Sequence, residues 1–175
     1  MRKKSDYTHH KKEKEKPLYL EGNLIHIGKK NLNGRVYTEE ISVELVQQFN
    51  KRKEKGDDVM GSLGYSSTDN YEVDLNHISH KVEKIEIDKD NNSLKGKIKL
   101  LDTPSGRKVK KIVEESIKNN KPIGMSCRPR LIGQVNIETK QIENFKILSI
   151  DLIPTQDDSF SNIYPNDFIK PSSEG

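Results

Sequence analysis

The sequence has little of what stabilises small secreted proteins or crosses membranes. Its single cysteine, Cys127, excludes an internal disulfide and a cysteine-rich zinc site. The five histidines match no spacing typical of metal ligands, and no motif indicates a cofactor. No apolar run approaches the roughly 20 residues of a membrane-spanning helix, and no apolar signal-peptide segment follows the basic N-terminus. We therefore expect a soluble protein made in the cytoplasm, with no membrane, metal or cofactor.

Aromatic residues are also scarce, with six tyrosines, four phenylalanines and no tryptophan. The net charge of +4 suggests a nucleic-acid-binding protein until the charge is located. Residues 1–16 hold seven of the 31 basic and three of the 27 acidic residues, which leaves 24 of each sign elsewhere. A neutral body without a basic, aromatic cluster disfavours nucleic-acid binding except through this N-terminal arm, which we expect to be disordered.

The apolar residues come in ordered bursts that predict one folded domain at 17–160. Residues 1–16 are predicted to be a disordered tail and residues 161–175 a mobile tail. Helical spacing predicts helices over about 39–55 and after the turn at 102–106. Strands are predicted at 17–27, 59–65, 78–88, 93–101, 130–137 and 141–152. The fold class is therefore α+β, with a mostly antiparallel curled sheet or β-barrel and two or more helices.

One stretch, residues 123–130 (IGMSCRPR), can be interpreted as a catalytic centre. Ser126 stands between a glycine and an arginine near the start of a predicted strand, where its hydroxyl can be presented beside backbone N–H groups and Arg128. The alternative is a serine that only satisfies a turn before a strand. Cys127 is disfavoured as a nucleophile, because strand alternation points it to the opposite face.

The order of several short motifs resembles the head-maturation proteases of tailed bacteriophages, the T4-type prohead core protease family. Residues 18–22 (LYLEG) and 31–37 (NLNGRVY) resemble the family's first strand and its Asn-x-Asn-x-Arg-x-Tyr signature. Residues 124–128 (GMSCR) resemble the nucleophile motif Gly-x-Ser-Ser-Arg. Further matches lie at 73–75 (VDL), 78–82 (ISHKV), 96–106 (GKIKLLDTPSG) and at Asp151 before 152–154 (LIP).

The resemblance implies a serine endopeptidase with a fold similar to the herpesvirus assembly proteases. It implies action on capsid and scaffold proteins in the host cytoplasm, inside the phage prohead or virion, and leaves a homo-oligomer open. Ser126 is then the nucleophile, Arg128 a candidate oxyanion stabiliser and Asp151 a candidate supporting residue. No cofactor is implied.

The sequence departs from the family at the general base. The family's catalytic histidine lies in a Gly-Glu-Leu-x-His-Pro motif, and the matching residues 61–66 (GSLGYS) place Tyr65 there. A tyrosine is a poor base at neutral pH, because its pKa is about 10 against about 6.5 for histidine. Either His80, on the matching Ser-His strand, has become the base for Ser126, or the site has decayed and the fold serves capsid assembly.

Overall fold

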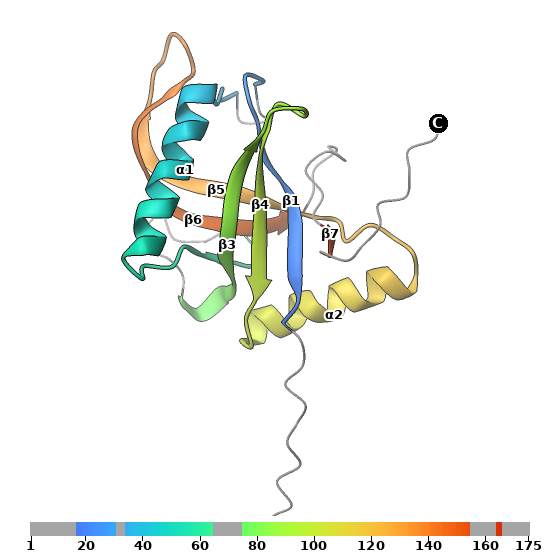
Figure 1. Cartoon of the computed structure of the whole chain (residues 1–175). Helices are drawn as coiled ribbons and strands as arrows, with labels where there is room; N and C mark the ends of the chain where they lie inside the picture. The colour runs from blue at the N-terminus through green and yellow to red at the C-terminus, as the bar shows by residue number, and fades with distance from the viewer. Residues whose placement is uncertain (1–16, 31–33, 65–74, 155–163, 166–175) are drawn as a thin grey trace, which may run out of the picture.

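The computed structural model describes residues 17–30, 34–64, 75–154 and 164–165 (Figure 1). Two helices accompany seven strands and one short 3-10 helix within these ranges, so the α+β prediction is confirmed. In chain order the elements are β1 (Tyr19–His26), α1 (Glu39–Glu54), β2 (Met60–Ser62), η1 (Leu75–His77), β3 (Ile78–Asp88), β4 (Ser93–Leu100), α2 (Pro104–Lys118), β5 (Met125–Val135), β6 (Ile142–Pro154) and β7 (Tyr164–Pro165).

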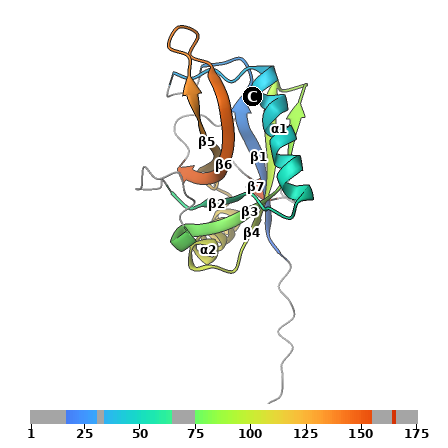
Figure 2. The ribbon, with the colours of Figure 1, turned by 90° about the vertical axis from the view of Figure 1, so that its left-hand side faces the viewer.

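The strands form two antiparallel layers that meet at their margins. One sheet has the order β2-β3-β4-β1-β7, and β5 pairs with β6 in a long ribbon. The ribbon crosses behind the first sheet in Figure 1, and Figure 2 shows it as a separate layer beside β1. A bridge between Leu63 and Leu152 joins the end of β2 to β6, and β1 packs beside β5. The strands thus wrap around one core, as a curled sheet close to a barrel does.

The first helix begins where the sequence predicts it, and α2 begins at Pro104, inside the segment 102–106 predicted to be a turn and helix entrance. The Thr38 hydroxyl caps α1 by accepting a hydrogen bond from the Ile41 N–H at 3.3 Å, and Glu39 and Glu40 occupy the first turn. The Thr103 hydroxyl caps α2 by accepting from the Gly106 N–H at 3.0 Å. The same hydroxyl donates to the Ile78 carbonyl, which ties the start of α2 to β3.

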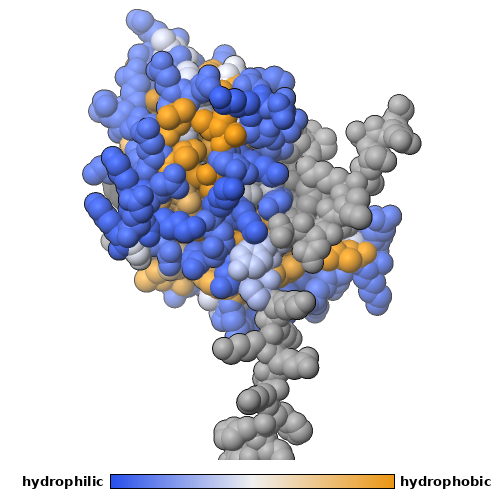
Figure 3. All heavy atoms as spheres, viewed as in Figure 1, coloured by the Kyte–Doolittle hydropathy of each residue, from blue (hydrophilic) through white to orange (hydrophobic). Residues whose placement is uncertain are grey.

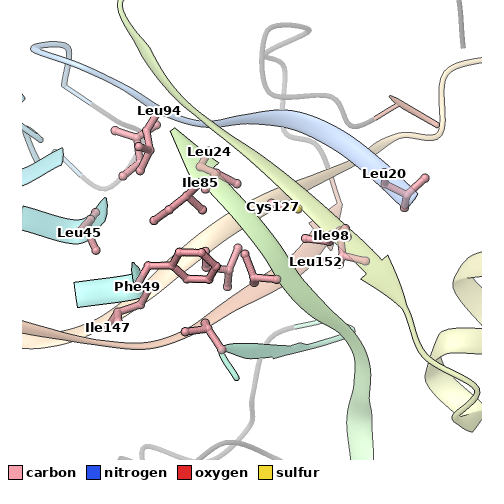
Figure 4. Close-up of a cluster of buried hydrophobic side chains, with 14 of the residues drawn as sticks. Leu20, Leu24, Leu45, Phe49, Ile85, Leu94, Ile98, Cys127, Ile147 and Leu152 are labelled. Atoms are coloured by element: carbon pink, nitrogen blue, oxygen red, sulfur yellow. The ribbon is translucent and has the colours of Figure 1, made fainter. Parts of the chain in front are cut away.

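The core lies between the two layers and is completed by α1 (Figure 4). Alternation along β4 turns Leu94 and Ile98 inward, both 1% exposed, while three lysines between and beyond them are partly exposed. Phe49 of α1, 2% exposed, packs into the same cluster. The face seen in Figure 3 is accordingly mostly hydrophilic, with a strip of hydrophobic residues at its upper left. Within the described residues, neither helix is long and apolar enough to cross a membrane.

Two elements differ from the sequence prediction. The fifth strand begins at Met125 and not at 130, so Ser126 lies inside a strand and not in the turn before it. The strand includes Pro129, and a proline is tolerated where its nitrogen needs no ladder partner. Beyond the predicted domain boundary at 160, Tyr164–Pro165 pairs with Leu20 and Glu21 of β1.

The exposed edge of β6 is closed by a side chain of α1. The Gln48 amide donates to the Phe145 carbonyl at 2.8 Å and accepts from the Ile147 N–H at 3.0 Å. One glutamine therefore makes the two hydrogen bonds that a neighbouring strand would make. This protects a strand edge that would otherwise be open to pairing with another chain.

Gln48→Glu is expected to destabilise the protein by about 1 to 3 kcal/mol, because the Phe145 carbonyl loses its donor and faces a carboxylate. Glu44, whose carboxylate accepts from the Gln48 amide at 3.3 Å, adds like-charge repulsion. The measurement is urea unfolding at pH 7. Gln47→Glu makes the same chemical change at an exposed position of the same helix and is expected to cost far less. Equal midpoints for the two variants would show that the edge contact contributes nothing.

Candidate functional site

Ser126 lies on the face of β5 that points away from the core cluster. Its neighbours in the chain, Met125 and Cys127, belong to that cluster, so alternation turns Ser126 the other way. Ser126 lies opposite Ile153 on β6, and Arg128 lies opposite Asp151. The strand pairing thus brings the predicted nucleophile, the predicted oxyanion stabiliser and the predicted supporting carboxylate onto one face of the ribbon.

Asp151 is held by three groups of its surroundings. Its Oδ1 accepts from the backbone N–H of Ser62 at 3.0 Å and from the Ser62 hydroxyl at 3.2 Å. Its Oδ2 lies 3.7 Å from Nε of Arg130, which also donates to the Ser149 hydroxyl at 3.2 Å. Asp151 is only 6% exposed, and these contacts stabilise its charge. Both carboxylate oxygens are therefore already engaged in holding β2 and β5 against β6.

His80 is fully buried, and both of its ring nitrogens have partners. Its Nε2 lies 2.5 Å from the Ile150 carbonyl, and its Nδ1 lies 2.7 Å from the Ser79 hydroxyl. A carbonyl can only accept, so Nε2 carries the proton and Nδ1 accepts from Ser79. Burial lowers the pKa of His80 to about 4, against the smaller opposing effects of the Ile150 carbonyl and the Asp151 charge. His80 is thus a neutral link between β3 and β6.

The structure does not pair His80 with Ser126. His80 contacts β6 at Ile150, whereas Ser126 lies opposite Ile153, three residues or about 10 Å further along the strand. Within the described residues, the Ser126 hydroxyl makes no hydrogen bond. The contacts of His80 therefore favour its structural interpretation over its role as a base.

Arg128 lies two residues from Ser126 on the same face and is half-buried. In the part of the chain that the structure describes, its guanidinium has no hydrogen bond or ion pair. Its charge affects the titration of Tyr37. Burial raises the pKa of Tyr37, and the charges of Arg35 and Arg128 lower it by a smaller amount. A guanidinium that is partly desolvated and unneutralised is suited to binding an anion beside the serine.

Tyr65 lies outside the described residues, but the chain can be followed to the residue before it. The Gly64 N–H donates to the Leu152 carbonyl at 2.7 Å, and Leu63 forms a bridge with Leu152. Leu152 adjoins Ile153, the strand partner of Ser126. Gly64, the last described residue before position 65, therefore lies across β6 from the serine.

Cys127 is no alternative nucleophile, since burial raises its pKa to about 12, with a further contribution from Asp151. Sequence reasoning missed the buried partners of the site, above all Ser62 and Ser149. The only local sequence signal of this close packing was Gly61, because a glycine within a strand often marks a close approach of other groups. Among the described residues, no group of three or more metal-ligating side chains is placed to hold a metal ion.

The titration of His80 predicts a pH dependence of stability. Its pKa is lower in the fold than the ordinary value of 6.5, so its contribution is complete above pH 6.5 and is lost as the pH falls toward about 4. By pH 4.5 the loss should reach roughly 2 to 3 kcal/mol. Carboxylates titrate in the same range, so the measurement is the difference in unfolding free energy between the protein and His80→Gln. That difference should shrink from pH 7 to pH 4.5, and a constant difference would contradict the assignment.

The fold is shared with a known phage protein. The structure aligns with the bacteriophage T4 capsid assembly protease, gp21, with a TM-score of 0.62, over 79% of this chain and 82% of that chain. Sequence identity in the alignment is 18%, a level at which the likeness shows the fold. No protein-family model matches the sequence, and no curated protein sequence matches it significantly.

Proposed function

We propose that this chain is a protein of the prohead-protease type that acts with capsid and scaffold proteins in the forming head of a phage, and that its serine site lacks a competent general base. The shared fold and the ordered motifs around Ser126, Arg128 and Asp151 support the first part. The hydrogen bonds of His80 support the second. The place of action is the prohead, within the host cytoplasm.

The observation that carries the proposal is the engagement of both His80 nitrogens away from Ser126. A general base must lie within hydrogen-bond reach of the hydroxyl that it deprotonates, directly or through one water. Rotating His80 toward the serine would leave the buried Ile150 carbonyl without its donor, at a cost of about 1 to 3 kcal/mol. With tyrosine at position 65, neither of the two positions considered for the base supplies a free imidazole to Ser126.

A second candidate, an active serine endopeptidase, is favoured by Arg128. If a base were present, the Ser126 oxygen would attack the peptide carbonyl, the base would take the hydroxyl proton and return it to the leaving amine, and Arg128 would stabilise the oxyanion. A positive charge on the face of β5 that carries Ser126 is what such a site needs. The two candidates thus differ in one group, the base.

The proposal is tested by serine-directed labelling together with a cleavage assay. The purified protein, incubated with a fluorophosphonate probe and separately with its capsid and scaffold proteins, should be neither labelled nor able to cleave at a rate above that of Ser126→Ala. Binding to the scaffold or capsid proteins, measured by co-sedimentation, should be the same for both proteins. Labelling or cleavage that Ser126→Ala abolishes would favour the endopeptidase, and absence of binding would remove the assembly role.

A further inference from the structure

Three lysines of β4, here called the lysine row, follow one another along the solvent face of the five-stranded sheet: Lys95, Lys97 and Lys99. Alternation buries the residues between them and leaves each lysine partly exposed. β4 lies between β3 and β1, so the row runs inside the sheet and not along its edge. Since alternate residues of a strand are about 6.6 to 6.8 Å apart, three positive charges stand at that spacing on one face.

The neighbouring lysines of β3 are paired with acids, and the lysine row is not. The ammonium group of Lys81 lies 3.9 Å from the carboxylate of Asp58 and 3.7 Å from that of Glu83. The ammonium group of Lys84 lies 3.0 Å from the carboxylate of Glu86. Among the residues that the structure describes, no such ion pair involves a member of the lysine row. The acids of β3 are thus already engaged beside the row.

The lysine row is unfavourable for the sheet that carries it. Lys99 lies opposite Lys81 of β3, and Lys97 lies opposite Lys84 of the same strand. Like charges directly opposite each other on neighbouring strands destabilise a sheet. Glu21 of β1, opposite Lys97, offsets only part of this repulsion. An anion bound from outside would relieve it, so the row is suited to binding a ligand with several negative charges.

We propose that the lysine row binds an extended acidic segment of a partner protein. Alternate side chains of an extended chain point to the same side, about 6.6 to 6.8 Å apart, so acids at every second residue match the spacing of the row. Opposite charges across such a contact steer the encounter and fix its register. That the partner is a capsid or scaffold protein is the one step that rests on the proposed function.

A single-stranded nucleic acid is also a polyanion, but it fits this face less well. Proteins that bind single strands combine a basic groove with several aromatic side chains on which bases stack. Among the residues of β1 and β3 that lie opposite the row, Tyr19 alone is aromatic. The ammonium group of Lys97 already lies over its ring, 4.9 Å from the ring centre. Glu21 and Glu86, opposite members of the row, would repel phosphates, whereas basic residues of a polypeptide can pair with them.

The test measures binding of a fluorescein-labelled peptide of about eight Glu-Ser repeats to the full-length protein, by fluorescence anisotropy at low ionic strength. The strand variant carries Lys95→Gln, Lys97→Gln and Lys99→Gln. The helix variant, which has the same net charge, replaces three exposed lysines of α2, namely Lys108→Gln, Lys111→Gln and Lys118→Gln. The strand variant is expected to bind the peptide about tenfold more weakly, because three ion pairs with the peptide are lost. The helix variant should change the affinity by less than about twofold.

Equal weakening in the two variants would overturn the proposal, because the peptide would then respond to net charge alone. Absence of measurable peptide binding would overturn it as well. An oligo(dT) of similar charge that binds more tightly than the peptide, and loses this binding in the strand variant, would assign the face to nucleic acid instead.

A second measurement separates binding from folding. Lys99→Gln removes a charge opposite Lys81, so its urea midpoint should be at least that of the unmodified protein. A clear loss of stability would show that the row serves the fold and would contradict the proposal. If the peptide binds as expected while the capsid and scaffold proteins do not co-sediment with the chain, the proposed function fails and the site on β4 stands.

Discussion

Tyr65→His is expected to create Ser126-dependent cleavage of the capsid or scaffold proteins, at a rate roughly 10² to 10⁴ above that of the unmodified protein. Histidine supplies a base whose ordinary pKa lies near neutrality, while tyrosine remains protonated there. The chain enters position 65 from Gly64, which is bonded to Leu152 beside the strand partner of Ser126. Arg128, on the same face of β5 as Ser126, is the proposed source of positive charge for the oxyanion.

The measurement is cleavage followed by gel electrophoresis and by fluorophosphonate labelling. Tyr65→Phe is the matched control, because it keeps the ring and supplies no base. Tyr65→His/Ser126→Ala tests whether any new cleavage passes through the serine. A folded Tyr65→His protein that neither cleaves nor reacts with the probe would show that the site has lost more than its base.

Ser62 should not be changed together with Tyr65, although the Gly-Glu-Leu-x-His-Pro motif has a glutamate at the position of Ser62. Ser62 is 1% exposed and donates twice to Asp151, so Ser62→Glu would bury a second carboxylate beside the first and remove a hydroxyl donor. Like charges at such a distance cannot both remain ionised without a large cost. We therefore expect the double variant Tyr65→His/Ser62→Glu to be less stable than Tyr65→His.

Local patterns predicted most of the fold because they are set by neighbouring residues. The strands predicted at 78–88 and 93–101 are β3 and β4, and the helix predicted over about 39–55 is α1. The first residue of β5 and the pairing of β7 could not be predicted in this way. Both depend on a partner strand distant in the sequence, and propensity is a weak guide where such pairing decides.

The same distinction between local patterns and distant partners applies to the residues of the candidate site. Ser126, Arg128 and Asp151 were predicted as site residues from their motifs, and the register of β5 with β6 brings them to one face. His80 as a base was inferred from its residue type and strand position alone. Its actual partners are a carbonyl 70 residues away in the sequence and the adjacent serine, and neither contact has a sequence signature.

Gly61→Ala is expected to have the largest effect on stability, a loss of at least about 3 kcal/mol. β2 runs between β3 and β6, and Gly61 lies opposite His80. A Cβ at position 61 would lie 1.8 Å from the Ile150 carbonyl oxygen and 2.3 Å from His80 Nε2. The imidazole reaches Ile150 by occupying the space that a side chain of residue 61 would need. A methyl group there must displace both the ring and a backbone carbonyl of β6.

Gly96→Ala is the matched control, since it also adds a methyl group within a strand. The three atoms nearest to its Cβ would all belong to the side chain of Leu24, at 2.9 to 3.1 Å, and a leucine side chain can move. Urea unfolding at pH 7 should therefore give a much smaller loss for Gly96→Ala than for Gly61→Ala. Adding His80→Ala to Gly61→Ala should recover little, because the Ile150 carbonyl still blocks the methyl group. Similar losses for the two glycine variants would contradict the packing of His80 across β2, and with it the argument for a structural role of His80.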